Sequence, residues 1–222
     1  MLIAETLEKL NFEVIIDTNI ANRGAFVEVI EKFGDKRENY DIAFIYYAGH
    51  GVQIDGENYL LPTKEKFENQ NHIRNKALPA QNIMNYLTGM TDKVNIIILD
   101  ACRDNPFEQN WNRTRSLKGG GLAKMPPPKG SLIAFSTDPG EVAYDGESTN
   151  SPYAASLSKH LLEEGLEIRD VFVKVRLEVE KLESGQSPDT RDKLQGELFL
   201  KERTFSEEFE KIESLFEKEQ YV

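Results

Sequence analysis

The stretch Tyr46-Tyr-Ala-Gly-His-Gly51 ends a short apolar run, Asp41-Ile-Ala-Phe-Ile-Tyr-Tyr47, and these residues decide the fold. A nearly continuous apolar run of this length is typical of a strand that a parallel sheet buries on both faces. A glycine-rich break at the carboxyl end of such a strand is where open α/β sheets place their functional sites. The sequence therefore predicts a site around His50.

A second strand of the same kind, Val94-Asn-Ile-Ile-Ile-Leu99, runs directly into Asp100-Ala-Cys102. Because the carboxyl ends of parallel strands meet at one edge of a sheet, we expect His50 and Cys102 to lie close together. A neighbouring imidazole favours the thiolate, which is the nucleophilic form of cysteine. The glycines that flank His50 would let a substrate approach and would leave N–H groups for a developing oxyanion. The alternative for Cys102 is a small buried apolar residue.

Strands and helices alternate along the rest of the chain, which predicts an α/β sandwich around a mostly parallel central sheet flanked by helices. Asp55-Gly56 predicts a hairpin between two short apolar segments. Gly34 is expected to end a helix that begins near residue 21. Further strands are predicted at 12–17, 131–136 and 198–200, and further helices at 1–10, 79–90, 152–162 and 168–182.

The composition excludes several classes of protein. The 222 residues include 27 Lys+Arg and 38 Asp+Glu, and a net charge of −11 argues against a nucleic-acid partner. One cysteine and three histidines exclude an internal disulfide and leave no zinc-site spacing. No apolar run reaches the roughly 18 residues of a membrane span, and the acidic start is unlike a signal peptide. We therefore expect a soluble, cytoplasmic protein with no membrane partner.

The sequence divides into a domain over residues 1–204 and a tail over 205–222. Within the domain, 103–130 contains three consecutive glycines and Pro126-Pro-Pro128, which predicts a long mobile connection. The tail predicts an acidic amphipathic helix that packs on the domain or on a partner helix. Its apolar stripe is formed by Phe205, Phe209, Ile212 and Phe216.

The two strand-end motifs, with their histidine and cysteine, resemble those of caspase-fold cysteine peptidases over about residues 1–200. The resemblance is strongest to the metacaspase and paracaspase branch, especially bacterial caspase-like proteins, and Asn150-Ser-Pro-Tyr153 adds to it. It implies a caspase-like three-layer sandwich and a cysteine endopeptidase that forms an acyl-enzyme intermediate. In that enzyme His50 is the general base, Cys102 is the nucleophile, and the backbone N–H groups of Gly51 and Cys102 form the oxyanion hole.

The same resemblance places Asp100 in the pocket for the residue before the scissile bond and implies protein or peptide substrates with Arg or Lys there. A carboxylate in that pocket can pair a guanidinium and would repel an acidic side chain. The alternative for Asp100 is a strand-end residue that caps a neighbouring helix. Asp138, Glu141 and Asp145 fall in the expected substrate-binding loop, where they either add to the pocket or are solvated charges.

The basic residues of the long connection are candidate sites of self-cleavage, since members of the resembled family often cut themselves there. These residues are Arg113, Arg115, Lys118 and Lys124. A solvated flexible linker is the alternative. No cofactor and no metal ligands are expected; some family members need calcium, but no stretch here has the spacing of an EF-hand loop. A calcium requirement stays an open question.

The chain departs from the resemblance at its start, because it opens in the helix that should follow the first strand of the family. That strand should lie between the strands predicted at 12–17 and 41–47, and its absence would expose unpaired backbone. Three explanations stay open: a truncated start, a strand or other protein partner supplied by another chain, or a module without activity. The alternative function is therefore a catalytically inactive caspase-like module for binding or signalling.

Overall fold

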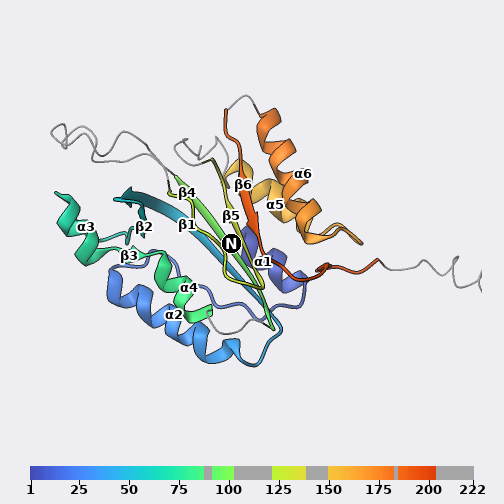
Figure 1. Ribbon diagram of the computed structural model, residues 1–222, viewed down its shortest axis with the longest axis horizontal. Coiled ribbons are helices and arrows are strands. Elements are labelled where there is room, and N and C mark those ends of the chain that lie inside the picture. Colours follow the sequence, from blue (N-terminus) through green and yellow to red (C-terminus); the bar gives the residue numbers. More distant parts are fainter. Residues whose placement is uncertain (88–91, 103–121, 139–149, 183–184, 204–222) are drawn as a thin grey trace, which may run out of the picture.

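The computed structural model describes residues 1–87, 92–102, 122–138, 150–182 and 185–203. In these residues one sheet has the strand order β3-β2-β1-β4-β5-β6, with helices on both faces (Figure 1). The strands are β1 (Ile42–Ile54), β2 (Glu57–Leu60), β3 (Leu78–Pro79), β4 (Val94–Cys102), β5 (Ser131–Phe135) and β6 (Asp189–Asp192). The helices are α1 (Leu2–Lys9), α2 (Arg23–Arg37), α3 (Gln70–Lys76), α4 (Gln81–Leu87), α5 (Pro152–Leu161) and α6 (Ile168–Lys181).

Two cores separate the three layers, which confirms the predicted α/β sandwich. Helices α1, α5 and α6 pack on one face of the sheet, and α2 and α4 pack on the other. Successive side chains of β4 point to opposite faces of the sheet, so Ile96 and Ile98 lie in the first core, and Ile97 and Leu99 lie in the second. All four side chains are at most 1% exposed, which is the burial that a continuous apolar strand requires.

The centre of the sheet is parallel and both ends are antiparallel. β1 pairs β4 and β4 pairs β5 in parallel, while β2, β3 and β6 run antiparallel to their neighbours. The predicted hairpin joins β1 to β2, and both turn residues have positive φ, 51° at Asp55 and 85° at Gly56. That pair of angles is the type I′ turn that Asp-Gly favours between strands.

Several sequence-based predictions were wrong. The strand that contains Asp41–Tyr47 does not end at the glycine-rich residues 48–51: β1 continues through His50 to Ile54, and residues 51–54 pair with β2. Gly34 does not end α2, which continues to Arg37; a Cβ at Gly34 would lie 3.1 Å from Tyr86 Cδ1, so the glycine allows α4 to approach. The buried Arg37 then donates to Asn95 Oδ1 at the start of β4. Residues 198–200 form no strand, because β6 takes the sheet edge and Phe199 makes a single bridge with Glu167.

The strand predicted at residues 12–17 is also absent. These residues have no regular secondary structure, and Phe12 packs against Phe44 of β1. On the side of β1 away from β4, residues 42–49 pair with no other strand in the described ranges. Ile45 and Tyr46 are consequently half-buried, whereas their register partners Ile97 and Ile98 are completely buried. A strand in the middle of the fold thus has an open edge, which we name the β1 open edge (residues 42–49).

No helix in the described part of the chain is both long and apolar enough to cross a membrane.

Candidate active site

The parallel register of β1 and β4 brings the two strand-end motifs together. The pairing begins at Ile42 opposite Val94 and continues without a bulge to His50 opposite Cys102. Residues 52 positions apart in sequence are therefore neighbours across one rung of the sheet. His50 is exposed at this edge. An uninterrupted register is the reason why the two motifs, each placed at the end of an apolar run, meet at the same level.

Tyr47 holds the backbone of His50. Its hydroxyl donates to the His50 carbonyl oxygen at 2.8 Å, and it reaches there by passing over Gly49. A Cβ at Gly49 would lie 2.7 Å from Tyr47 Oη, so only glycine leaves room for this bond. Burial raises the pKa of Tyr47 well above its usual value, which keeps the hydroxyl protonated as a donor. Nothing in the local sequence pattern distinguishes this tyrosine from the other apolar residues of the strand.

Gly51 is required by close packing on the opposite layer. A Cβ there would lie 2.9 Å from Leu122 Cδ2 and 3.3 Å from Ala101 Cβ. Leu122 is 1% exposed and belongs to the core between the sheet and α2 and α4. Packing alone therefore explains a glycine at position 51, independently of any oxyanion that its N–H binds.

Asp100 lies two residues beyond Ile98 on β4 and is 8% exposed. Its Oδ2 accepts hydrogen bonds from Tyr46 Oη and from Ser151 Oγ, both at 2.6 Å. Ser151 is also the N-cap of α5, where its Oγ accepts from the Ala154 N–H at 3.0 Å. Asp100 thus reaches the start of α5 through Ser151, which agrees with the alternative of a strand-end residue that contacts a helix N-terminus.

Two tyrosines surround the Asp100 carboxylate. Burial and then the nearby negative charge raise the pKa of Tyr46 far above its usual value. The pKa of Tyr153 is raised by the same two causes, and its hydroxyl is buried without a hydrogen-bond partner in the described residues. Both phenols are therefore neutral at physiological pH. The sequence analysis quoted both tyrosines inside motifs but gave neither a role, because nothing local shows that they face Asp100.

The other predicted site residues are spread or lie beyond what can be described. Asp138 is exposed just after β5, and Lys124 is exposed in the segment that precedes β5. Five predicted residues fall outside the described ranges: Arg113, Arg115, Lys118, Glu141 and Asp145. The described residues hold no group of three or more His, Cys, Asp or Glu side chains arranged for a metal ion.

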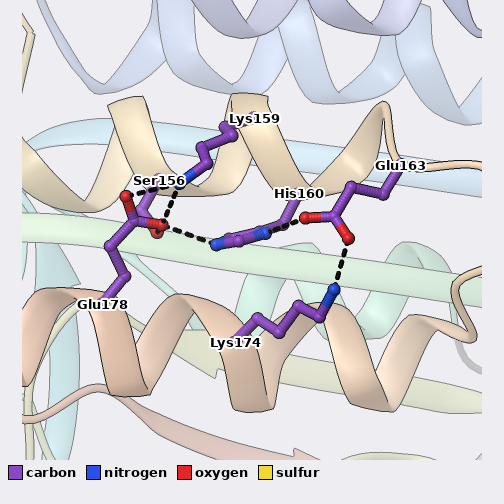
Figure 2. A network of polar contacts seen from close by, with 6 residues as sticks. All are labelled: Ser156, Lys159, His160, Glu163, Lys174 and Glu178. Atoms are coloured by element: carbon purple, nitrogen blue, oxygen red, sulfur yellow. Dashed lines mark hydrogen bonds and ion pairs between the residues drawn. The ribbon is translucent and has the colours of Figure 1, made fainter.

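A separate polar network joins α5 to α6 (Figure 2). His160 is 7% exposed; its Nε2 contacts Glu178 Oε2 at 2.6 Å and its Nδ1 contacts Glu163 Oε1. Lys174 lowers the pKa of Glu163, Lys159 lowers that of Glu178, and His160 adds to both shifts. The His160 ring thus contacts a carboxylate at each of its two nitrogens, one from just after the end of α5 and one from α6. This histidine stabilises helix packing and lies apart from the strand-end site.

Comparison with known proteins agrees with this architecture. A search of curated proteins finds no match. A family model described as the caspase domain matches residues 1–199, which include β1, β4 and both strand-end motifs. Cysteine peptidase activity is what this family suggests, although it also includes inactive members. Since the match covers most of the chain, the protein belongs to the caspase domain family.

Proposed function

We propose that this protein is a cysteine endopeptidase that cleaves after Arg or Lys through a Cys102–His50 dyad. The observation that carries the proposal is the register that sets His50 opposite Cys102 at the last rung of the parallel β1–β4 pairing of a caspase domain. A base and a thiol on neighbouring strand ends are the pair that nucleophilic catalysis needs. Tyr47 supports the arrangement, because it ties down the His50 carbonyl group.

The reaction would proceed in two halves. His50 accepts the proton of the Cys102 thiol, and the thiolate attacks the carbonyl carbon of the scissile bond. The N–H groups of Gly51 and Cys102 stabilise the oxyanion, and the C–N bond breaks as His50 returns the proton to the leaving amine. Water then attacks the thioester with His50 as base, and the acid product leaves with the thiol restored.

Specificity for Arg or Lys rests on Asp100. Both hydrogen bonds from described residues go to Oδ2, which leaves Oδ1 for the cationic group of a substrate. Fixing a carboxylate in advance reduces the ordering cost of binding a guanidinium or ammonium group at Oδ1. Asp138, Glu141 and Asp145 are candidates for further contacts to the same substrate side chain. The metacaspase or paracaspase branch is the one whose substrate preference this carboxylate fits.

The test is turnover of a peptide panel that varies only the residue before the scissile bond. We expect turnover after Arg and Lys that disappears in Cys102→Ala and falls by about a hundredfold or more in Asp100→Asn. Asp100→Asn keeps the shape of the side chain, so it isolates the charge. Parallel assays with and without added calcium test the calcium requirement. Turnover after Asp would overturn the specificity, and silence from a folded sample would overturn the peptidase.

One observation favours the alternative of an inactive binding or signalling module. The β1 open edge leaves the strand that carries His50 unsupported on one side. Such an edge is a template for an added strand, and we propose that another chain supplies it where the module acts. Peptide binding by the chain without turnover, unchanged in Cys102→Ala, would favour this module over the peptidase.

Self-cleavage follows from the same specificity. Arg113, Arg115, Lys118 and Lys124 are basic residues in the connection between β4 and β5, and an enzyme that prefers Arg or Lys would cut there. Incubation of the wild-type chain and Cys102→Ala, followed by mass measurement, tests it: fragments ending at one or more of these residues are expected from the wild type alone.

A further inference from the structure

The segment that leads into β5 is held against the strand that carries His50. We call residues 122–125 the anchor segment. Leu122 and Met125 are 1% and 7% exposed and pack in the core with Leu99 and Ala101. Leu122 fills the space left by the missing side chain of Gly51, immediately after His50. Although it follows the long connection, this segment is therefore tightly packed.

Asn58 on β2 fixes the main chain of the anchor segment. Its Nδ2 donates to the Ala123 carbonyl oxygen at 2.8 Å, and its Oδ1 accepts from the Ala123 N–H. Asn58 is 5% exposed, and its backbone carbonyl oxygen accepts a hydrogen bond from the Ala80 N–H at 2.8 Å. A primary amide offers one donor and one acceptor side by side. The Asn58 side chain therefore makes the two hydrogen bonds with the Ala123 backbone that a neighbouring strand would otherwise make.

The anchoring affects how accessible the peptide bond after Lys124 is to a peptidase. The Lys124 side chain is exposed, so by sequence and by accessibility it would count as a cleavage site. A peptidase, however, binds several residues on either side of the bond in an extended form, with their backbone groups available. Here the backbone of Ala123 is occupied by Asn58, and the side chains of Leu122 and Met125 are buried. Cleavage would require the segment to detach first.

We propose that Asn58 and Leu122 anchor residues 122–125 to the strand that bears His50 and thereby shield the bond after Lys124, which confines processing to Arg113, Arg115 and Lys118. Self-processing at those residues rests on the proposed function, whereas the anchoring does not. Asn58 acts here as a positioning residue. Cleavage at a shielded bond proceeds at a rate set by the population of locally opened molecules, so weakening the anchor should expose Lys124 in proportion.

The test uses trypsin, which cuts after Arg and Lys whatever the activity of this chain. Full-length Cys102→Ala is digested briefly, and the fragments are identified by intact mass. We expect cuts after Arg113, Arg115 or Lys118 before any cut after Lys124. Adding Asn58→Ala should speed the cut after Lys124 by about tenfold or more. Asn85→Ala removes an exposed asparagine of α4 and is the matched control, with no change expected. Equal early cutting at Lys124, or no acceleration in Asn58→Ala, would overturn the anchor.

A second measurement covers the case in which Asn58→Ala fails to fold. In Cys102→Ala alone, the Ala123 amide should exchange with solvent at least about a hundredfold more slowly than in an unstructured peptide. Exchange at the peptide rate would refute the anchor. If the wild-type chain shows no self-cleavage while both trypsin and exchange results hold, the self-cleavage proposal fails and the anchor stands.

Discussion

At the scale of single residues, the two tyrosines beside Asp100 differ in their hydrogen bonds, so their substitution by Phe should have different effects on stability. Tyr46 donates to the carboxylate, whereas the Tyr153 hydroxyl is buried without a partner in the described residues. Removing a hydrogen bond to a charged group costs about 1.5–3 kcal/mol, while removing an unsatisfied buried hydroxyl costs little. We expect Tyr46→Phe to lose about 2 kcal/mol of unfolding free energy and Tyr153→Phe to stay within about 1 kcal/mol of wild type.

Urea unfolding of the two variants beside the wild type checks this prediction, and each serves as the control for the other. Equal losses would show that the Tyr153 hydroxyl has a partner after all.

The network around His160 predicts how stability depends on acid. The pKa of Glu163 and that of Glu178 are both below the usual value of 4.5, mainly through Lys174 and Lys159 respectively. A carboxyl with a depressed folded pKa stabilises the fold above its unfolded pKa, and that contribution is lost as the pH falls through the folded pKa. The wild type should therefore lose more stability from pH 5 downward than the double variant Glu163→Gln and Glu178→Gln.

Unfolding free energies measured from about pH 3 to 7 for both proteins provide the comparison, with the largest difference near neutral pH and convergence in acid. Parallel curves would contradict the role given to these two carboxylates.

At the scale of elements, Gly51 of β1 is explained by the Leu122 side chain, which packs directly against it. Gly51→Ala would place a methyl group 2.9 Å from Leu122 Cδ2, and such overpacking costs about 1–3 kcal/mol. Combining it with Leu122→Ala should recover part of that loss, because the second change removes the clashing atoms. A double-mutant cycle from denaturant unfolding measures the coupling. Additive losses would mean that the two positions do not contact.

Strand β1 also predicts a pattern of amide exchange. The Val94 N–H donates to the Asp41 carbonyl at 2.9 Å, and a parallel ladder uses alternate residues of each strand. The N–H groups of Ala43, Ile45 and Tyr47 therefore point to β4, and those of Phe44 and Tyr46 point to the β1 open edge. We expect the second set to exchange at least about tenfold faster than the first in residue-resolved measurements.

Uniform protection along β1 would show that a strand or a second copy covers the edge in solution. Fast exchange of both sets would contradict the β1–β4 pairing itself.

At the scale of the whole molecule, the sheet joins residues that are about a hundred positions apart in the sequence, from His50 to Ser151, into one site. β1 carries His50, β4 carries Asp100 and Cys102, and the N-cap of α5 holds Asp100 from a position 51 residues further on. The anchor segment lies on the opposite layer and meets the same strand at Gly51. The candidate site is thus supported from both faces of the sheet, while its remaining side is the β1 open edge.

Patterns between neighbouring residues allowed much of this to be predicted from sequence. The apolar runs of β1 and β4, the Asp-Gly turn and the Ser151 cap are local, because burial, turn angles and capping depend on residues a few positions apart. The convergence of His50 and Cys102 was predicted from the rule that parallel strands end at one edge, although β1 itself continues to Ile54 and only its parallel pairing with β4 ends at His50.

Only the tertiary structure decided the rest. Asn58 binds Ala123 from 65 residues away, and Glu178 meets His160 from another helix. Such partners are selected by strand register and helix packing, which no local pattern encodes. For the same reason 12–17 reads as a strand in sequence but forms none, because a strand exists only where a neighbour shares its hydrogen bonds. The sequence alone determined which segments are apolar and where they turn; the packed sheet decided which side chains meet.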